Sequence, residues 1–249
     1  MSDTPSAPHA KHPLADPTHR SFLLRKLHSL SGVVPVAGFV IFHLWTNAKA
    51  MSGQEGFDAA VLEINHMAYL PFLEAGILLP LAFHGLYGIK LALDGRPNLG
   101  RYGYARNWMY VLQRVTGVIA LLFIGGHLWE LRVQKALGVL GPTGFYPTLT
   151  AHLSSTTMGV PLMAIFYLVG IAACAFHLAN GLLGFCASWG IMLTRRSQRL
   201  GALAFSALGL VVFVLGANTT LYFATGSRWF GAQSSPAAPA VNPSSATVK

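Results

Sequence analysis

Charged residues are scarce in this chain. They make up 10% of its 249 residues, whereas apolar residues make up 53% and the mean hydropathy is +0.50. Soluble domains carry about 25% charged residues, and disordered chains combine high charge with low hydrophobicity. The shortage therefore argues against a soluble globular protein and against a mainly disordered one, and it favours an integral membrane protein.

Acidic residues and cysteines are fewer still. Only 8 Asp and Glu stand against 17 Lys and Arg, which gives a formal net charge of +9. These basic residues do not gather in one patch, so we expect no nucleic-acid partner. In membrane proteins a basic excess marks cytoplasmic loops. Cys174 and Cys186 lie in apolar sequence and form no CxxC pair, so we interpret them as buried thiols without a disulfide.

Long apolar runs occupy most of the chain. Five of them are near the roughly 20 residues that cross a lipid bilayer as a helix. They run over residues 30–50, 70–93, 110–131, 160–184 and 200–223. The sequence predicts an all-α integral membrane protein with five transmembrane helices. We expect a flexible tail over residues 1–20 that is not a signal peptide, a five-helix domain over 21–226 and a disordered tail over 227–249.

Basic residues are unequally divided between the two ends of the predicted helices. Twelve of the 17 lie on the side of the N-terminus and 5 on the other side. The twelve are Lys11, Arg20, Arg25, Lys26, Lys90, Arg96, Arg101, Arg106, Arg114, Arg195, Arg196 and Arg199. The basic side of a membrane protein faces the cytoplasm. We expect a multi-pass protein of a bacterial-type inner membrane, with a cytoplasmic N-terminus and an outer C-terminus.

One histidine lies late in each of the first four apolar runs. They are His43, His84, His127 and His177. Ionisable groups in membrane helices cost free energy and usually mark function, so four of them are hard to explain as packing. Since successive helices run in opposite directions, His43 and His127 fall near the outer side, and His84 and His177 near the inner side. At 1.5 Å per residue the two layers are about 10–15 Å apart.

Two facing imidazoles inside a helical bundle suit the two axial positions of a haem iron. With both positions filled, oxygen has no open site, and electron transfer is the function that remains. Zinc is a weaker alternative because it prefers four clustered ligands. Glycines beside the histidines leave room for a flat ligand, although small residues also let helices pack closely. We therefore expect the first four helices to form a haem-binding bundle.

The first two helices and the next two resemble two copies of one hairpin. Residues 117–129 echo residues 32–45, each with an early glycine and a late His-Leu-Trp triplet. Residues 175–181 echo residues 82–88. The repeat supports two equivalent sites.

Five short segments together resemble a known family. They are RKLHSLSG at 25–32, HLW at 43–45, FHGLYG at 83–88, QRVTG at 113–117 and FHLANGL at 176–182. Over residues 20–226 the chain resembles the cytochrome b membrane anchor of succinate dehydrogenase and fumarate reductase, in particular its single-chain, five-helix, two-haem type. A cytochrome b subunit of a hydrogenase or formate dehydrogenase is one alternative. A proton-coupled transporter without haem, whose histidines relay protons, is another.

The resemblance implies a subunit of the respiratory chain and tricarboxylic acid cycle that anchors a flavoprotein and an iron–sulfur subunit on the cytoplasmic face. It implies electron transfer between the iron–sulfur subunit and a membrane quinone, menaquinone or ubiquinone, through two b-type haems, with no dicarboxylate site in this chain. His43 and His127 would be the distal ligands, and His84 and His177 the proximal ones. Some fumarate-reducing members carry protons on a glutamate where this chain has Ala175, so that route is not expected here.

Polar residues near the two histidine layers are further candidates. Four near the inner side have donors that suit haem propionates, although ordinary basic flanking of a membrane helix explains them equally well. They are Arg25, His28, Ser29 and Arg114. Quinol oxidation releases protons, and an acid near the outer layer would accept them. The candidate acids are Glu74, for which a water-exposed helix start is the alternative, and Glu63 and Asp58 in the preceding loop.

Overall fold

The computed structural model describes residues 17–97, 99–101, 103–227 and 229. Over these residues the chain is helical, apart from connecting loops and one isolated bridge between Thr157 and Val160. The first helix, α1 (Pro17–Ser31), includes the last four residues of the predicted N-terminal tail. Residues 1–16, and all but Ser227 and Trp229 of the predicted C-terminal tail, lie outside the described residues.

Five long helical segments are apolar enough to cross a membrane, as predicted. They cover Thr18–Ser52, Leu70–Leu93, Ala105–Ala136, Leu162–Ser188 and Arg195–Thr225. Four of them extend beyond the apolar runs, the first by 12 residues at its start, because polar residues continue a helix past the hydrocarbon region that hydropathy detects. The last begins at a capping box between Thr194 and Ser197 and ends at Gly226, whose φ of 71° stops the helix.

The first and third spans are interrupted helices. The first continues from α1 through a π-helical turn, η2 (Gly32–Ala37), into α2 (Gly38–Asn47) and a 3-10 turn, η3 (Ala48–Ser52). The third consists of α5 (Ala105–His127), the π-helical turn η4 (Leu128–Val133) and α6 (Gln134–Ala136). The second, fourth and fifth are the single helices α4 (Leu70–Leu93), α8 (Leu162–Ser188) and α9 (Arg195–Thr225).

The π-helical turn η2 lies between the early glycine and the histidine of the first span. Gly32 lies 11 residues before His43, whereas its counterpart Gly117 lies 10 residues before His127. Pro35 lies inside η2 and has no N–H, so the regular α-helical hydrogen bonding fails there. The wider turn holds an additional residue. We infer that it absorbs the extra residue of the first span, which brings His43 to the depth of His127.

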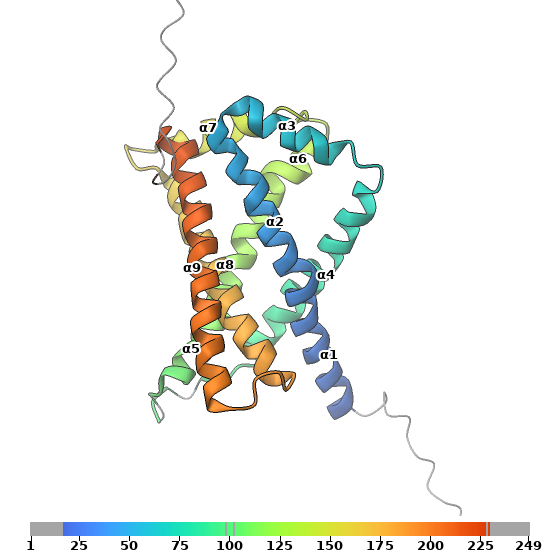
Figure 1. Cartoon of the computed structure of the whole chain (residues 1–249), viewed down its shortest axis with the longest axis vertical. Helices are drawn as coiled ribbons and strands as arrows, with labels where there is room; N and C mark the ends of the chain where they lie inside the picture. The colour runs from blue at the N-terminus through green and yellow to red at the C-terminus, as the bar shows by residue number, and fades with distance from the viewer. Residues whose placement is uncertain (1–16, 98, 102, 228, 230–249) are drawn as a thin grey trace, which may run out of the picture.

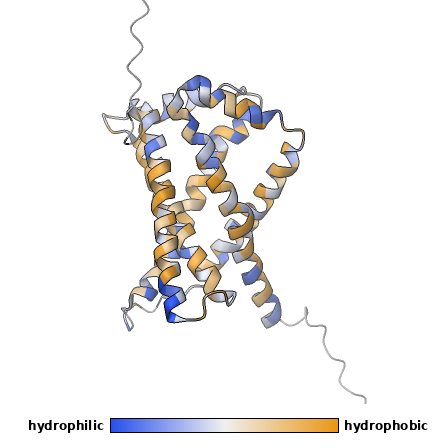
Figure 2. Cartoon of the chain, viewed as in Figure 1, coloured by the Kyte–Doolittle hydropathy of each residue, from blue (hydrophilic) through white to orange (hydrophobic). Residues whose placement is uncertain are grey.

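Two short helices that the sequence did not predict cover one end of the bundle (Figure 1). They are α3 (Gln54–Asn65) and α7 (Phe145–Ser154), each in a connection between spans. The opposite end carries the start of α1 and the connection between α8 and α9 (Figure 1). Polar residues gather at both ends and apolar residues in the middle (Figure 2). Large apolar side chains such as Phe72 and Leu79 stay exposed there, as expected for a surface that faces lipid.

Helix α8 is central to the packing, because it contacts α9 and α5 most extensively. Small residues allow these close contacts. Gly170 on α8 faces Phe123 of α5, and Gly209 of α9 faces Ala175 and Ala179 of α8. On the other side of the bundle, α1 and η2 pack against α4. The four histidine-bearing spans therefore meet around one interior.

Replacing Gly170 with valine should separate α5 from α8. A Cβ at Gly170 would lie 2.7 Å from the Cβ of Phe123, so the helices must shift apart. Overpacking of this kind lowers the free energy of unfolding by about 1–3 kcal/mol. Thermal unfolding in detergent, followed by circular dichroism, should show a lower midpoint. The control is Gly184→Val in the same helix, where an added Cβ meets nothing within 4 Å; equal midpoints for the two variants would contradict the packing argument.

Candidate functional site

The structure brings the four histidines of the first four spans together in two pairs. The ring centroids of His43 and His127 are 5.7 Å apart, and those of His84 and His177 are 6.1 Å apart. These are the pairs that the topology led us to expect. A metal that binds one nitrogen of each of two opposed imidazoles at roughly 2 Å separates the ring centroids by roughly 6 Å. Both separations fit such a metal, and the role of the histidines as ligands stays a prediction.

His84 and His177, called here the inner pair after the predicted orientation, each bind a backbone carbonyl on a neighbouring helix. Nδ1 of His84 lies 2.9 Å from the carbonyl oxygen of His28, and Nδ1 of His177 lies 3.0 Å from that of Gln113. A carbonyl oxygen only accepts hydrogen bonds, so each Nδ1 carries the proton and donates. In a neutral imidazole the lone pair is then on Nε2, the form that binds a metal.

Glycines make room for these inner imidazoles. Gly32 and Gly117 each follow the accepting carbonyl by four residues, one helical turn. A Cβ at Gly32 would lie 2.7 Å from Nδ1 of His84, and a Cβ at Gly117 would lie 2.8 Å from Cε1 of His177. Because glycine has no Cβ, each ring lies against the helix backbone and reaches the carbonyl. The two predicted hairpins thus hold their inner histidines in the same way.

Amide side chains tie the fourth span to the third beside His177. Nε2 of Gln113 donates to the carbonyl of His177 at 3.0 Å, and Nδ2 of Asn180 donates to Oε1 of Gln113 at 2.8 Å. Neither amide is among the site residues predicted from the sequence. Their occurrence inside apolar helices was the available signal, because an amide in lipid needs a partner.

The outer pair has side-chain partners instead. Nδ1 of His127 lies 3.2 Å from the hydroxyl of Tyr167, which donates to a carboxylate oxygen of Glu130 at 2.9 Å. The other oxygen of Glu130 is bonded to the imidazole of His152. Asn47 lies 3.3 Å from both ring nitrogens of His43. Sequence reasoning missed Glu130 and Tyr167, because the two residues are 37 positions apart and meet only when the third and fourth spans pack.

The propionate candidates differ in their surroundings. The ring of His28 stacks on that of His84 with 4.1 Å between centroids. Nδ1 of His28 and Nε of Arg114 are buried and have no hydrogen-bond partner among the described residues. Ser29, in contrast, accepts a hydrogen bond from Trp189, and Arg25 is exposed. The two unpaired nitrogens fit an anionic group that enters near the inner pair.

The three candidate acids also differ. Glu74 forms a two-pronged ion pair with Arg132, at 2.9 and 2.5 Å, which joins α4 to η4. Asp58 has one oxygen near Gln54 and one buried oxygen with no hydrogen-bond partner among the described residues, and Glu63 is exposed. Ala175, where the resemblance would place a glutamate in some fumarate-reducing members, is 4% exposed, and its carbonyl oxygen lies against Gly209 of α9.

Metal sites with many protein ligands are not formed in the described part of the chain. No group of three or more His, Cys, Asp or Glu side chains there is placed to hold a metal ion. The arrangement of two imidazoles per site suits a metal whose other positions are filled by a cofactor, as in haem.

Comparison with known proteins gives two matches. Residues 94–216 match the family model described as the succinate dehydrogenase/fumarate reductase transmembrane subunit. The chain is also 39% identical over 197 residues to the succinate dehydrogenase cytochrome b558 subunit of Bacillus subtilis, across 79% of this chain and 92% of that protein. No solved structure matches the chain.

Replacing Gly117 with alanine should push the His177 ring away from the Gln113 carbonyl. Loss of a partner that orients a metal ligand typically weakens metal binding about tenfold. We expect less haem at the inner pair, measured as the haem-to-protein ratio and the reduced-minus-oxidised visible spectrum. Gly76→Ala on α4 is the control, because an added Cβ there meets nothing within 4 Å and this exposed glycine is not beside a histidine. Equal haem contents in both variants would argue against the role of Gly117.

Proposed function

This chain belongs to the succinate dehydrogenase/fumarate reductase family of transmembrane cytochrome b subunits, which anchor the complex in the membrane, and on that premise we propose that it conducts electrons through two b-type haems. The observation that carries this proposal is the presence of two opposed imidazole pairs in the first four spans. The name of the Bacillus subtilis relative, a cytochrome b558, supports the haem type.

In this proposal, the residues of the chain bind the haems and orient the histidines that hold them. His43 and His127 hold the outer haem, and His84 and His177 hold the inner one. The carbonyls of His28 and Gln113 keep the protons of the inner imidazoles on Nδ1, so that Nε2 is available. When bound, the haems supply one-electron carriers between an iron–sulfur subunit and a membrane quinone. The apolar helices around them exclude water.

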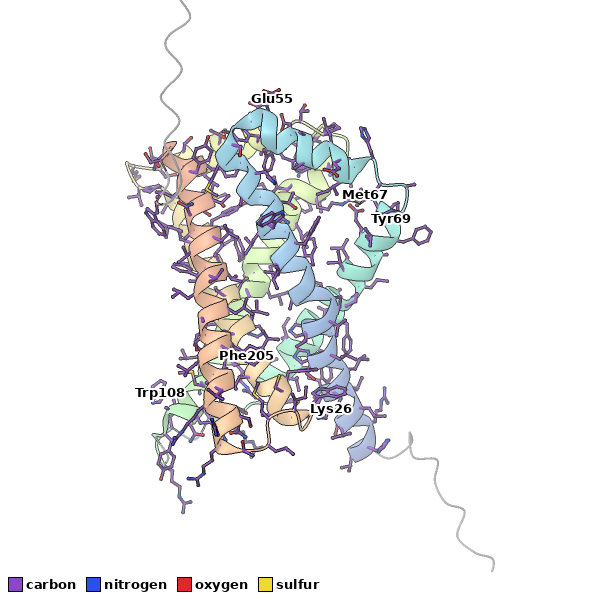
Figure 3. The ribbon with its side chains drawn as sticks, viewed as in Figure 1. Lys26, Glu55, Met67, Tyr69, Trp108 and Phe205 are labelled. Atoms are coloured by element: carbon purple, nitrogen blue, oxygen red, sulfur yellow. The ribbon has the colours of Figure 1, made fainter. Side chains whose placement is uncertain are left out.

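The basic end of the bundle is proposed to face the cytoplasm and to contact the flavoprotein and iron–sulfur subunits. Lys26 and Trp108 lie at this end, whereas Glu55, Met67 and Tyr69 lie at the other (Figure 3). Hydrogen bonds between residues of different spans hold the surface of this end in a fixed arrangement. Lys26 donates to the Ser188 carbonyl, Trp189 to Ser29 at 3.0 Å, and Arg106 to Gln198 at 2.8 Å.

The outer side is proposed to exchange protons with a quinone, menaquinone or ubiquinone. Glu74, Glu63 and Asp58 are the candidate acceptors. Of these, Asp58 has the buried oxygen without a partner among the described residues, and Glu74 is held as an ion pair by Arg132. The propionate candidates at the inner side are His28 and Arg114, together with Ser29 and Arg25.

Substituting the histidines should remove the haems one at a time. The purified chain should contain two haems. His43→Ala or His127→Ala should lose mainly the outer haem, and His84→Ala or His177→Ala mainly the inner one. The measurement is the haem-to-protein ratio with a reduced-minus-oxidised spectrum.

The control for this series is His66→Ala, which removes an exposed histidine between the first two spans. It should retain both haems. A chain without haem would refute the proposal and favour a transporter with proton-relaying histidines, and a chain with one haem would refute the assignment of two pairs.

A further inference from the structure

A row of hydrogen bonds leads from the outer histidine pair to the surface. His127 contacts Tyr167, Tyr167 contacts Glu130, and Glu130 contacts His152. The side chain of His152 is 50% exposed, that of Glu130 is 12% exposed, and Tyr167 is 5% exposed. The row therefore begins in water and ends at a half-buried imidazole that the proposed function assigns to the outer haem.

The direction of these hydrogen bonds follows from the chemistry of the groups. An ionised carboxylate only accepts, so the hydroxyl of Tyr167 donates its single proton to Glu130 at 2.9 Å. The phenol oxygen is then free to accept, and Nδ1 of His127, 3.2 Å away, donates to it. The lone pair of the His127 ring is consequently on Nε2, as in the inner pair.

Packing keeps the three side chains in place. Glu130 follows His127 by three residues and lies in the π-helical turn η4, which directly continues the helix that carries His127. Tyr167 reaches across from α8, where its ring contacts those of Phe123 and Phe166. The apolar rings exclude water from the hydroxyl, which strengthens its hydrogen bonds.

We infer that Tyr167 and Glu130 are positioning residues for the outer haem, which orient the His127 imidazole and increase its electron donation to the iron. The inference rests on the proposed function. A carboxylate that pulls on the phenol proton makes the phenol oxygen a stronger acceptor, and the imidazole becomes a better donor to the metal. Such a ligand stabilises ferric over ferrous iron and lowers the midpoint potential.

The inner pair lacks this negative charge. Its Nδ1 atoms donate to the neutral carbonyls of His28 and Gln113. Removing Tyr167 or Glu130 should therefore change one haem and leave the other unaltered. A general loss of stability would affect both haems, so a change in the outer haem alone distinguishes a positioning role from a structural one.

The test is a potentiometric titration of the haems in membranes that contain the whole complex. Tyr167→Phe removes the hydroxyl and keeps the ring, and Glu130→Gln removes the charge and keeps the size. Each should raise the midpoint potential of the outer haem, with a change in the ferric-to-ferrous ratio of about tenfold, equivalent to ~59 mV for one electron. The ferric low-spin electron paramagnetic resonance signal of that haem should shift as well, because its imidazole is free to rotate.

The matched control is Tyr146→Phe on α7. Tyr146 packs against Phe57 and Phe223 at the same end of the bundle. This variant should leave both potentials and both resonance signals unaltered. A shift equal to that of Tyr167→Phe would overturn the inference.

The remaining outcomes are also decisive. Two bound haems with unaltered potentials and signals in both test variants would overturn the inference and leave the proposed function intact. If Tyr167→Phe loses the outer haem, an unmoved potential in Glu130→Gln would overturn it. Absence of haem from the unsubstituted chain would overturn the proposed function together with the inference.

Discussion

The hydrogen bond from an imidazole Nδ1 to a backbone carbonyl of a neighbouring helix is the interaction on which the inner site depends. Inside a bilayer an N–H group without a partner is costly, so a membrane histidine must find an acceptor in the protein. His84 and His177 find it one turn before a glycine. The bond determines the orientation of the ring, the position of its lone pair and the approach of the two helices. No other residue can replace these two glycines, because a Cβ there would overlap the imidazole ring.

This hydrogen bond occurs in both halves of the histidine-bearing bundle. In each half, an early segment supplies a carbonyl, a glycine and an outer histidine, and the following span supplies the inner histidine. The halves are unequal in length by one residue between Gly32 and His43, and the π-helical turn around Pro35 accommodates it. A local irregularity thus preserves the long-range symmetry of two stacked sites.

The two layers differ in what lies behind the histidines. The inner layer is backed by neutral backbone carbonyls and lies near cationic side chains, whereas the outer layer is backed by Tyr167 and the carboxylate of Glu130. The outer end also carries the ion pair between Glu74 and Arg132, which joins the second span to the third. Electrostatics therefore distinguishes two sites that share the same pair of side chains. Under the proposed function, this difference would give the two haems different potentials.

The sequence by itself determined the five membrane helices, since hydropathy over about 20 residues is a property of one segment. It also determined which histidines share a depth, because alternating helix direction follows from the number of spans. It did not reveal α3 and α7, whose apolar faces are short and lie in connections. Only the tertiary structure decided that Tyr167 meets Glu130 and that His84 and His177 reach carbonyls. Such contacts depend on the rotation of each helix about its axis and on its closest neighbours, which segment hydropathy does not specify.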